Sequence, residues 1–335
     1  MIAGKIGGCY NEPKGDDFVR YRDFLGRKTS VIVMGSTGIG FDFSQKQTNE
    51  FLDAYVALGG NFIDTARVYG DFAGGVCGIS ERAIGNWMAA RHNRADLVIG
   101  TKGGHPLLSS MDVGRLDPES LKSDISESLA DLMTDQVDMY WLHRDDVSRP
   151  VGGILETLNG FIESGLTRAI GVSNWMPARI REANAYAAKH GLVGFIANQP
   201  QFSLARQALI EDPTLCQMDS EMYDFHLESK LVCIPYSSQA KGFFIKLSES
   251  GADALPDKAQ RRFLTPDNLA VYDRLLALSR ETGHSVGALS LAYLTCQPFD
   301  TFPIVGVSRL SQVQALREAG DAVITVEQAQ ALRRP

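Results

Sequence analysis

Eight short apolar segments recur along this chain of 335 residues, and stretches with helical spacing separate nearly all of them. Such alternation is typical of parallel strands joined by helices, and eight units without a linker favour one closed barrel over two smaller domains. Residues 1–23 fit no such unit and are predicted to form an N-terminal extension, packed on the base of the barrel or partly disordered. We therefore predict a single (β/α)8 TIM barrel over residues 24–335, with strands near Val31–Met34, Phe62–Ile63, Leu97–Ile99, Val137–Leu142, Ala169–Val172, Phe195–Ala197, Leu231–Ile234 and Phe302–Val305.

Two of the connecting helices have clear boundary signals. Asp117 followed by Pro118 is a typical helix start, because aspartate caps backbone N–H groups and proline fits the first helical position. A second helix is predicted from Pro177 to about Gly191. The segment Ser248–Thr265 is rich in Asp, Gly and Pro. We predict that it forms a long loop after the seventh strand, over the mouth of the barrel.

Bulk composition narrows the classes of function. A net charge of −7 without a dense run of Lys and Arg argues against a nucleic-acid surface. The five cysteines are widely spaced and include no Cys-x-x-Cys pair, which favours reduced thiols over a disulfide frame or a zinc site. No segment approaches the roughly 20 apolar residues of a membrane span, and no secretory signal is visible. We expect a cytoplasmic protein, monomeric or homo-oligomeric, that acts on a small molecule and binds neither nucleic acid nor membrane.

Ionisable side chains stand where three of the predicted strands end. Asp64 follows the strand that ends at Ile63, Tyr69 comes five residues later, and Lys102 and His143 follow the next two strands. The carboxyl ends of barrel strands converge on one rim, where active sites lie. A phenol with an ordinary pKa of about 10 is a weak acid at neutral pH, but a nearby ammonium favours the phenolate. Each residue alone is more often a cap, a solvated charge or a core group; the four in register predict a proton-delivering site.

These blocks resemble the aldo-keto reductase family, and the resemblance runs from about Phe24 to the C-terminus. Asn61–Gly70 and Gly171–Trp175 are the closest matches. The remaining blocks also fall at predicted strand ends, which makes the ordered set specific. In the family's order they are Lys102, His143, Asn198-Gln199 and Pro235-Tyr236-Ser237.

The resemblance implies an NAD(P)H-dependent oxidoreductase of CH–OH groups that reduces an aldehyde or ketone to an alcohol. Tyr69 would act as the general acid. Lys102 and Asp64 would tune the tyrosine, and His143 would orient the substrate carbonyl. The nicotinamide dinucleotide would lie extended across the mouth of the barrel, without a separate Rossmann domain.

By the same resemblance, the cofactor would be held by residues after several strands. Ser173, Asn174 and Gln199 would bind the nicotinamide carboxamide, and Tyr236 would stack on the ring. Two of these have ordinary alternatives, since Asn174 could be a turn residue and Tyr236 a packing aromatic. The remaining predicted cofactor contacts are Gly35, Ser237, Gln239, Gly242, Gly306, Ser308 and Arg309.

The expected site for the adenosine 2′-phosphate departs from the family pattern. Many members carry a Lys-Ser pair and a later arginine there, where this chain has Gly306-Val307 and Gln312. A glycine-containing turn that opens a helix, here from about Leu310, offers N–H groups to phosphate, and Arg309 adds a guanidinium. We therefore favour NADPH as the cofactor and keep NADH as the alternative.

The substrate is less constrained than the cofactor. A polar rim favours sugar-like or other hydroxylated carbonyls, though only weakly, since each rim residue could equally be an ordinary surface residue. The residues that could form the wall of the pocket are Phe72, His105, Arg144, Asp145 and Trp175.

Three other functions fit parts of the sequence. Gly35–Gly40 resembles the glycine-rich turn of short-chain dehydrogenases, but Met34 occupies the place of the first glycine, and the only Tyr-x-x-x-Lys is Tyr10–Lys14, upstream of it. A metal-dependent hydrolase would need clustered histidines, whereas the six here are scattered, so we predict no metal site. The remaining alternative is an accessory subunit that senses nicotinamide redox state with little turnover.

Overall fold

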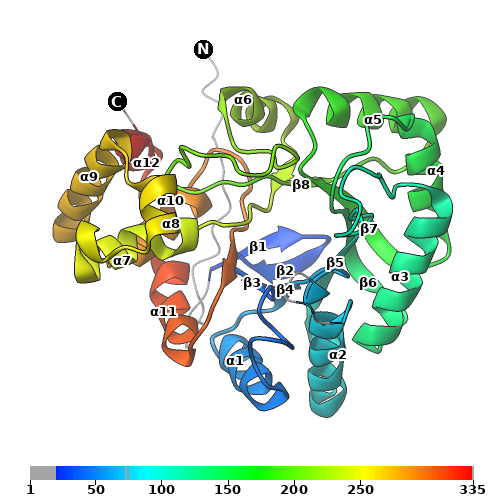
Figure 1. Cartoon of the computed structure of the whole chain (residues 1–335), viewed down its shortest axis with the longest axis horizontal. Helices are drawn as coiled ribbons and strands as arrows, with labels where there is room; N and C mark the ends of the chain where they lie inside the picture. The colour runs from blue at the N-terminus through cyan, green and yellow to red at the C-terminus, as the bar shows by residue number, and fades with distance from the viewer. Residues whose placement is uncertain (1–19, 72–73, 75, 334–335) are drawn as a thin grey trace.

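The computed structural model describes residues 20–71, 74 and 76–333. Eight parallel strands form one sheet, in which β10 lies beside β3 and the others follow in chain order to β9. Helices surround the strands (Figure 1). The strands are β3 (Val33–Gly35), β4 (Phe62–Asp64), β5 (Val98–Gly103), β6 (Val137–Leu142), β7 (Thr167–Ser173), β8 (Ala197–Gln199), β9 (Val232–Cys233) and β10 (Ile304–Gly306).

Hydrogen bonds between β9 and the chain around β10 close this sheet into a ring. The Cys233 N–H donates to the carbonyl of Asp300 over 2.8 Å, and the Phe302 N–H donates to the carbonyl of Cys233 over 2.9 Å. The Ile304 N–H donates to the carbonyl of Pro235 over 2.9 Å. The predicted (β/α)8 barrel is confirmed, and every predicted apolar segment overlaps a strand.

The connecting helices begin and end where local sequence signals place them. The Asp117 carboxylate accepts from the Ser120 N–H over 2.9 Å, and Pro118 is the first residue of its helix. A second helix starts at Pro177 and ends before Gly191, which has a left-handed backbone. No helix in the described ranges is both long and apolar enough to cross a membrane. The helices are α1 (Gln45–Ala57), α2 (Ile79–Arg91), α3 (Pro118–Leu132), α4 (Val151–Glu163), α5 (Pro177–His190), α6 (Ser220–Ser229), α7 (Phe243–Ser250), α8 (Asp257–Phe263), α9 (Pro266–Thr282), α10 (Val286–Thr295), α11 (Leu310–Asp321) and α12 (Val326–Arg333).

An antiparallel hairpin precedes the barrel, formed by β1 (Tyr21–Phe24) and β2 (Arg27–Ser30). Arg27 donates to the carbonyls of Ala95 and Leu97, just before β5, so the hairpin lies at the amino ends of the strands. The ring of Phe24 packs within 5.6 Å of Phe62 and belongs to the apolar cluster inside the barrel. The hairpin spans the predicted boundary between residues 23 and 24, and residues 1–19 lie outside the described part.

Two long connections reach over the carboxyl ends of the strands. The one after β9 was predicted to be irregular over Ser248–Thr265, but much of it is helical. It holds the end of α7, a short 3-10 helix at Ala252–Ala254, and α8. The buried side chains of Leu255 and Phe263 anchor this segment. The more irregular connection is residues 200–219, which follow β8 and run toward α8 (Figure 1).

Candidate functional site

Four of the predicted site residues lie together at the carboxyl ends of neighbouring strands. Asp64 ends β4, Lys102 lies near the end of β5, and His143 directly follows β6. The Lys102 ammonium contacts a carboxylate oxygen of Asp64 and donates to the carbonyl of Thr65 over 2.8 Å. It also lies 3.5 Å from the Tyr69 hydroxyl. The lysine therefore connects a buried carboxylate to a phenol.

The neighbours of Lys102 stabilise its protonated form. Its side chain is almost fully buried, as is that of Asp64. Burial alone would lower the pKa of Lys102, but the contacts with Asp64 and Tyr69 raise it above the ordinary value. The ammonium is therefore kept charged at neutral pH beside the phenol.

His143 is a buried, neutral imidazole next to this pair. Its ring lies edge-on to Tyr69, with 6.0 Å between ring centroids, and edge-on to His105, with 4.8 Å between centroids. Burial lowers the pKa of His143 well below its usual range, and the positive charges of Arg144 and Lys102 act in the same direction. Its Nδ1 atom has no hydrogen-bond partner within the described residues.

Arg67 fixes the segment that carries Tyr69 to the neighbouring strand and helices. The Arg67 N–H donates to the carbonyl of Lys102 over 3.0 Å. Its guanidinium contacts Glu127, lies 2.6 Å from Asp131 and 3.4 Å from Glu81. Burial raises the pKa of Glu81 to about 7. This anchorage limits how far the phenol can move from the lysine.

The residues predicted to bind the carboxamide also meet at this rim. Gln199 donates to Asp64 over 2.9 Å, and its own oxygen is buried without a partner among the described residues. The Asn174 amide donates to Ser173 and to the carbonyl of His143, and its oxygen accepts from Tyr236 over 2.8 Å and from the Cys216 N–H over 3.1 Å. Gln199 therefore has a free acceptor, whereas the hydrogen-bonding capacity of Asn174 is fully used.

The other predicted cofactor residues line the same cleft, whose volume is about 1350 Å³. From the four ionisable residues it extends past β9 to the start of α11. Gly35 gives room to the neighbouring strand here, because a Cβ atom would come within 2.7 Å of the Cγ2 atom of Ile304 and one of the two would have to shift. Arg309 is exposed and immediately precedes α11. The lining includes Asp64, Tyr69, Lys102, His143, Ser173, Asn174, Gln199, Tyr236, Ser237, Gln239, Gly242, Gly306, Ser308 and Arg309.

The residues suggested as a pocket wall are placed differently from one another. Arg144 lines the cleft. Among the described lining residues there is neither His105 nor Asp145 nor Trp175. Trp175 is fully buried against Phe195, and the Asp145 carboxylate pairs with Arg179 over 3.4 Å. Phe72 lies outside the described residues.

Sequence reasoning passed over several residues of the cleft. Lys241 lies in the turn between Gln239 and Gly242, and Leu215 comes from the irregular connection after β8. The position of Lys241 could have been noticed, because a basic residue next to a glycine before a helix is a common phosphate contact. Leu215 carried no signal, because nothing in its own segment shows which part of the barrel the segment covers.

The fold and the site together define a parallel β/α barrel that keeps a charged lysine beside a phenol at the rim of a long cleft. A profile of the aldo/keto reductase family matches residues 31–334, and the chain belongs to that family. The family resemblance expected from the sequence is thereby confirmed.

Similar proteins carry the names of oxidoreductases. The chain is 27% identical over 324 residues to an aryl-alcohol dehydrogenase, GME11368, from Pestalotiopsis microspora, covering 92% of this chain and 79% of the relative. It is 26% identical to norsolorinic acid reductase B from Dothistroma septosporum, covering 81% of this chain and 67% of the relative. The crystal structure of the thermostable aldo-keto reductase Tm1743 with the inhibitor epalrestat has a TM-score of 0.70 at 20% identity, covering 93% of this chain and 98% of that one. That structure supports the fold.

Proposed function

We propose that this protein is an oxidoreductase that reduces an aldehyde or ketone to the alcohol with NAD(P)H. The observation that carries the proposal is the position of Lys102, which contacts Asp64 and lies 3.5 Å from the Tyr69 hydroxyl. These groups lie at one end of a cleft of about 1350 Å³, enough for a dinucleotide and a small substrate. The family and the names of the relatives support an oxidoreductase.

In this proposal the residues of the chain handle the proton and the orientation of the carbonyl. The Tyr69 hydroxyl gives its proton to the carbonyl oxygen, and the Lys102 ammonium stabilises the phenolate that remains. Asp64 keeps the ammonium in place. The neutral imidazole of His143 donates its single N–H to the same oxygen and aligns it. The nicotinamide, when bound, supplies the hydride.

The rim of the cleft fits a nicotinamide carboxamide. The buried oxygen of Gln199 lacks a partner among the described residues and suits an amide N–H, since a buried acceptor left unpaired is costly. Ser173 and Asn174 border the same place. For Asn174 to bind the carboxamide it must exchange one of its present hydrogen bonds, such as that from Tyr236. Tyr236 is then free to stack on the ring.

We propose NADPH in preference to NADH. Arg309 is exposed at the far end of the cleft, and its side chain makes no hydrogen bond or ion pair with the described residues. It directly precedes α11, whose first N–H groups favour an anion. A 2′-phosphate there would meet both a guanidinium and a helix start.

The small-molecule substrate is proposed to be an aromatic carbonyl rather than a sugar. Tyr69, Tyr236, Phe41 and Leu215 give apolar and aromatic walls to the cleft. Two relatives are named for aryl-alcohol and norsolorinic acid chemistry. We further propose a cytoplasmic location, supported by the free thiols of the described cysteines, Cys77, Cys216, Cys233 and Cys296. Cys9 lies outside the described part of the chain.

The test is a paired measurement of binding and turnover. Titration of the purified protein with NADPH and NADH, followed by tryptophan fluorescence, gives the two dissociation constants. Loss of absorbance at 340 nm with benzaldehyde, acetophenone and a hexose gives the activity on each. We expect NADPH to bind more tightly and the aromatic aldehyde to be reduced fastest. Tight binding without turnover on any carbonyl would support the accessory, redox-sensing role instead.

A further inference from the structure

Arg144 is a cation of the cleft that the proposed reaction does not use. It directly follows His143 at the carboxyl end of β6 and lines the cleft with a side chain that is 11% exposed. One terminal nitrogen donates to the carbonyl of His143 over 2.9 Å, and the Nε donates to Thr214 over 3.1 Å. The guanidinium is therefore held beside a proposed catalytic residue in a fixed orientation.

The barrel separates Arg144 from the basic residues on the cofactor path. Along the ring, β6 and β10 are four strands apart, so they lie on opposite sides. Arg309 follows β10, and Lys241 follows the neighbouring β9. Arg144 therefore lies on the side of His143, whose ring lies 6.0 Å from that of Tyr69 and where the substrate carbonyl is expected.

The charge of Arg144 is less completely neutralised than that of Lys102. Lys102 contacts a carboxylate that is itself buried. The carboxylate nearest Arg144 is that of Asp212, 3.6 Å away and 37% exposed. One oxygen of Asp212 already accepts from the backbone N–H and the hydroxyl of Thr214. Of the five N–H groups that a guanidinium carries, several are left for another acceptor.

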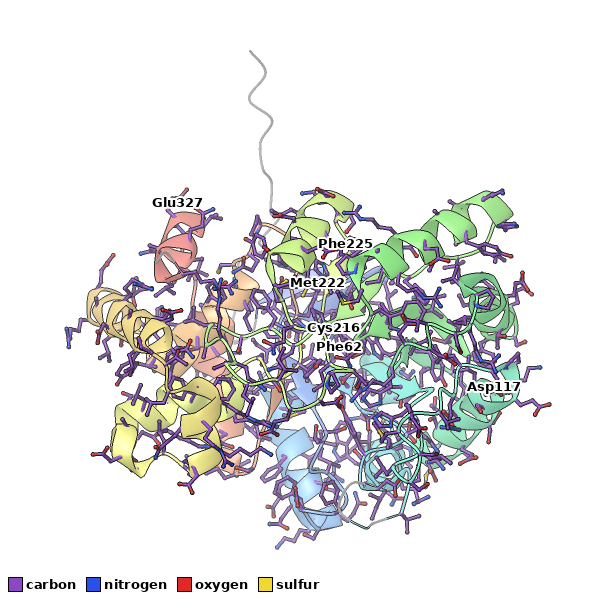
Figure 2. The ribbon with its side chains drawn as sticks, turned by 45° about the horizontal axis from the view of Figure 1, so that its top comes forward. Phe62, Asp117, Cys216, Met222, Phe225 and Glu327 are labelled. Carbon is purple, nitrogen blue, oxygen red and sulfur yellow. The ribbon has the colours of Figure 1, made fainter. Side chains whose placement is uncertain are left out.

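The loop that supplies Asp212 and Thr214 also forms part of the cleft. Leu215, from the same loop, lines the cleft, and the Cys216 N–H fixes the loop to Asn174. In Figure 2 the label of Cys216 marks this loop near the middle of the molecule. The substrate end thus combines an apolar wall with a guanidinium that is mostly withdrawn from water, where a charge-assisted hydrogen bond is strong.

We propose that Arg144 recognises a carboxylate on the substrate, so that the preferred substrates are aromatic aldehydes or ketones that bear an acidic group. The inference rests on the proposed function, which supplies the carbonyl end of the molecule. The carboxylate pairs with the free N–H groups of Arg144 while the carbonyl faces Tyr69 and His143. Asp212 competes with the substrate for the same guanidinium.

The experiment compares each acid with its neutral ester. The probes are the 2-, 3- and 4-carboxybenzaldehydes and the matching methyl formylbenzoates, measured with NADPH for KM and kcat. Dissociation constants are measured in parallel by tryptophan fluorescence. The quantity compared is the acid-to-ester ratio of affinities (1/Kd) and of kcat/KM within each variant. General damage to the site affects the acid and the ester equally and cancels in this ratio. We expect the wild type to favour the acid for at least one isomer, and the preference to weaken with added salt.

Substitutions of Arg144 and of Asp212 should change the acid-to-ester ratio in opposite directions. Arg144→Met should reduce the acid-to-ester ratio by about 10- to 100-fold through KM and Kd, the size of a hydrogen bond to a charged group. Arg144→Lys should keep part of the preference. Asp212→Asn should increase the ratio, since the competing carboxylate is gone. The matched control Arg149→Met, at a half-exposed arginine that pairs with Asp146, should leave the ratio unchanged.

The proposal is overturned if the wild type binds every acid no better than its ester, or if Arg144→Met lowers binding of acids and esters equally. The second result would make Arg144 a tether for the loop. Failure of the proposed function is separate, because it appears as an absence of reduction for acids and esters alike. The ratio of dissociation constants still decides the role of Arg144 in that case.

Discussion

Each end of the barrel holds one buried carboxylate paired with basic side chains, Asp138 at the base and Asp64 at the mouth. The two clusters differ in how many of their polar atoms have a hydrogen-bond partner. At the base, the Asp138 carboxylate lies 2.9 Å from Arg94, 3.2 Å from Arg168 and 3.5 Å from Arg27, and accepts from the Ile99 N–H over 2.9 Å. The arginines also donate to backbone carbonyls. This cluster joins the hairpin to three strand starts.

At the mouth, the Asp64 carboxylate has one lysine and one amide. Lys102 turns toward Tyr69, while Nδ1 of His143 and the oxygen of Gln199 have no partner among the described residues. Buried polar groups are normally hydrogen-bonded, so unpaired groups gathered at one place indicate a site that a ligand completes. The Asp138 carboxylate at the base is thus fully used by its neighbours, whereas the mouth, where we propose the function, keeps polar atoms that a ligand can pair.

The largest expected effect tests the function of the mouth. Tyr69→Phe removes only the hydroxyl, so carbonyl reduction should fall by about 10²–10⁴-fold, the usual contribution of a general acid. The melting temperature and NADPH affinity should stay close to the wild type. The half-buried Tyr186, far from the cleft, whose hydroxyl bonds Glu156 over 2.8 Å, is the matched control, and Tyr186→Phe should be fully active. Full activity in Tyr69→Phe would show that another group delivers the proton.

The second prediction concerns how much the Asp138 cluster at the base contributes to stability. Asp138→Asn leaves three arginines without their carboxylate, and removing one partner of a buried ion pair costs about 3–5 kcal/mol. The free energy of unfolding in urea should fall by this order, while kcat per folded molecule stays unchanged. Asp300→Asn is the control, because its carboxylate is 60% exposed where it pairs with Arg22. A loss of turnover in folded Asp138→Asn, at unchanged stability, would contradict the division between the two ends.

The sequence predicted the mouth better than the base for a physical reason. Active-site residues of a barrel follow strand ends, so Asp64, Lys102 and His143 could be located from the strands alone. The hairpin was missed because it is short and its residues do not alternate clearly. Its turn, Leu25-Gly26, has positive φ at both residues, and of these two only Gly26 is a residue type that favours such a turn.

The structure and contacts of the two long connections could not be predicted from the sequence. Apolar residues in Ser248–Thr265 are few, so the short helix α8 was not predicted, although Phe263 anchors it. The contacts of residues 200–219 with Arg144 and Asn174 join distant parts of the chain. No local pattern specifies which strand end such a loop covers, so these contacts had to come from the structure.

The third prediction asks how much the single lysine at the mouth contributes. Lys102→Met removes the positive charge beside Tyr69, and turnover should fall by about 10- to 1000-fold, since a nearby opposite charge shifts a proton equilibrium by about one to three powers of ten. Because the lysine no longer stabilises the phenolate that remains after proton transfer, the pH–rate profile should also differ from that of the wild type. Lys122→Met, on the exposed face of α3, is the control. A wild-type profile in Lys102→Met would make the lysine a purely structural partner of Asp64.

The smallest expected effect lies at the far end of the same cleft. Arg309 is the reverse of the arginines at the base, because it is exposed and makes no ion pair or hydrogen bond with the described residues. If it grips the 2′-phosphate, Arg309→Ala should weaken NADPH binding by about 1.5–3 kcal/mol, the range for a hydrogen bond to a charged group. NADH, which lacks that phosphate, should bind as before.

Fluorescence titration with both cofactors at two salt concentrations measures this effect. The preference of the wild type for NADPH should shrink as salt rises, because an exposed ion pair is screened. Arg280→Ala, at an exposed arginine on α9 that does not line the cleft, should leave both affinities unchanged. Equal losses for NADPH and NADH in Arg309→Ala would place the arginine on the shared part of the dinucleotide. Tighter binding of NADH by the wild type would instead mean that the Gly306–Arg309 turn has no phosphate to hold.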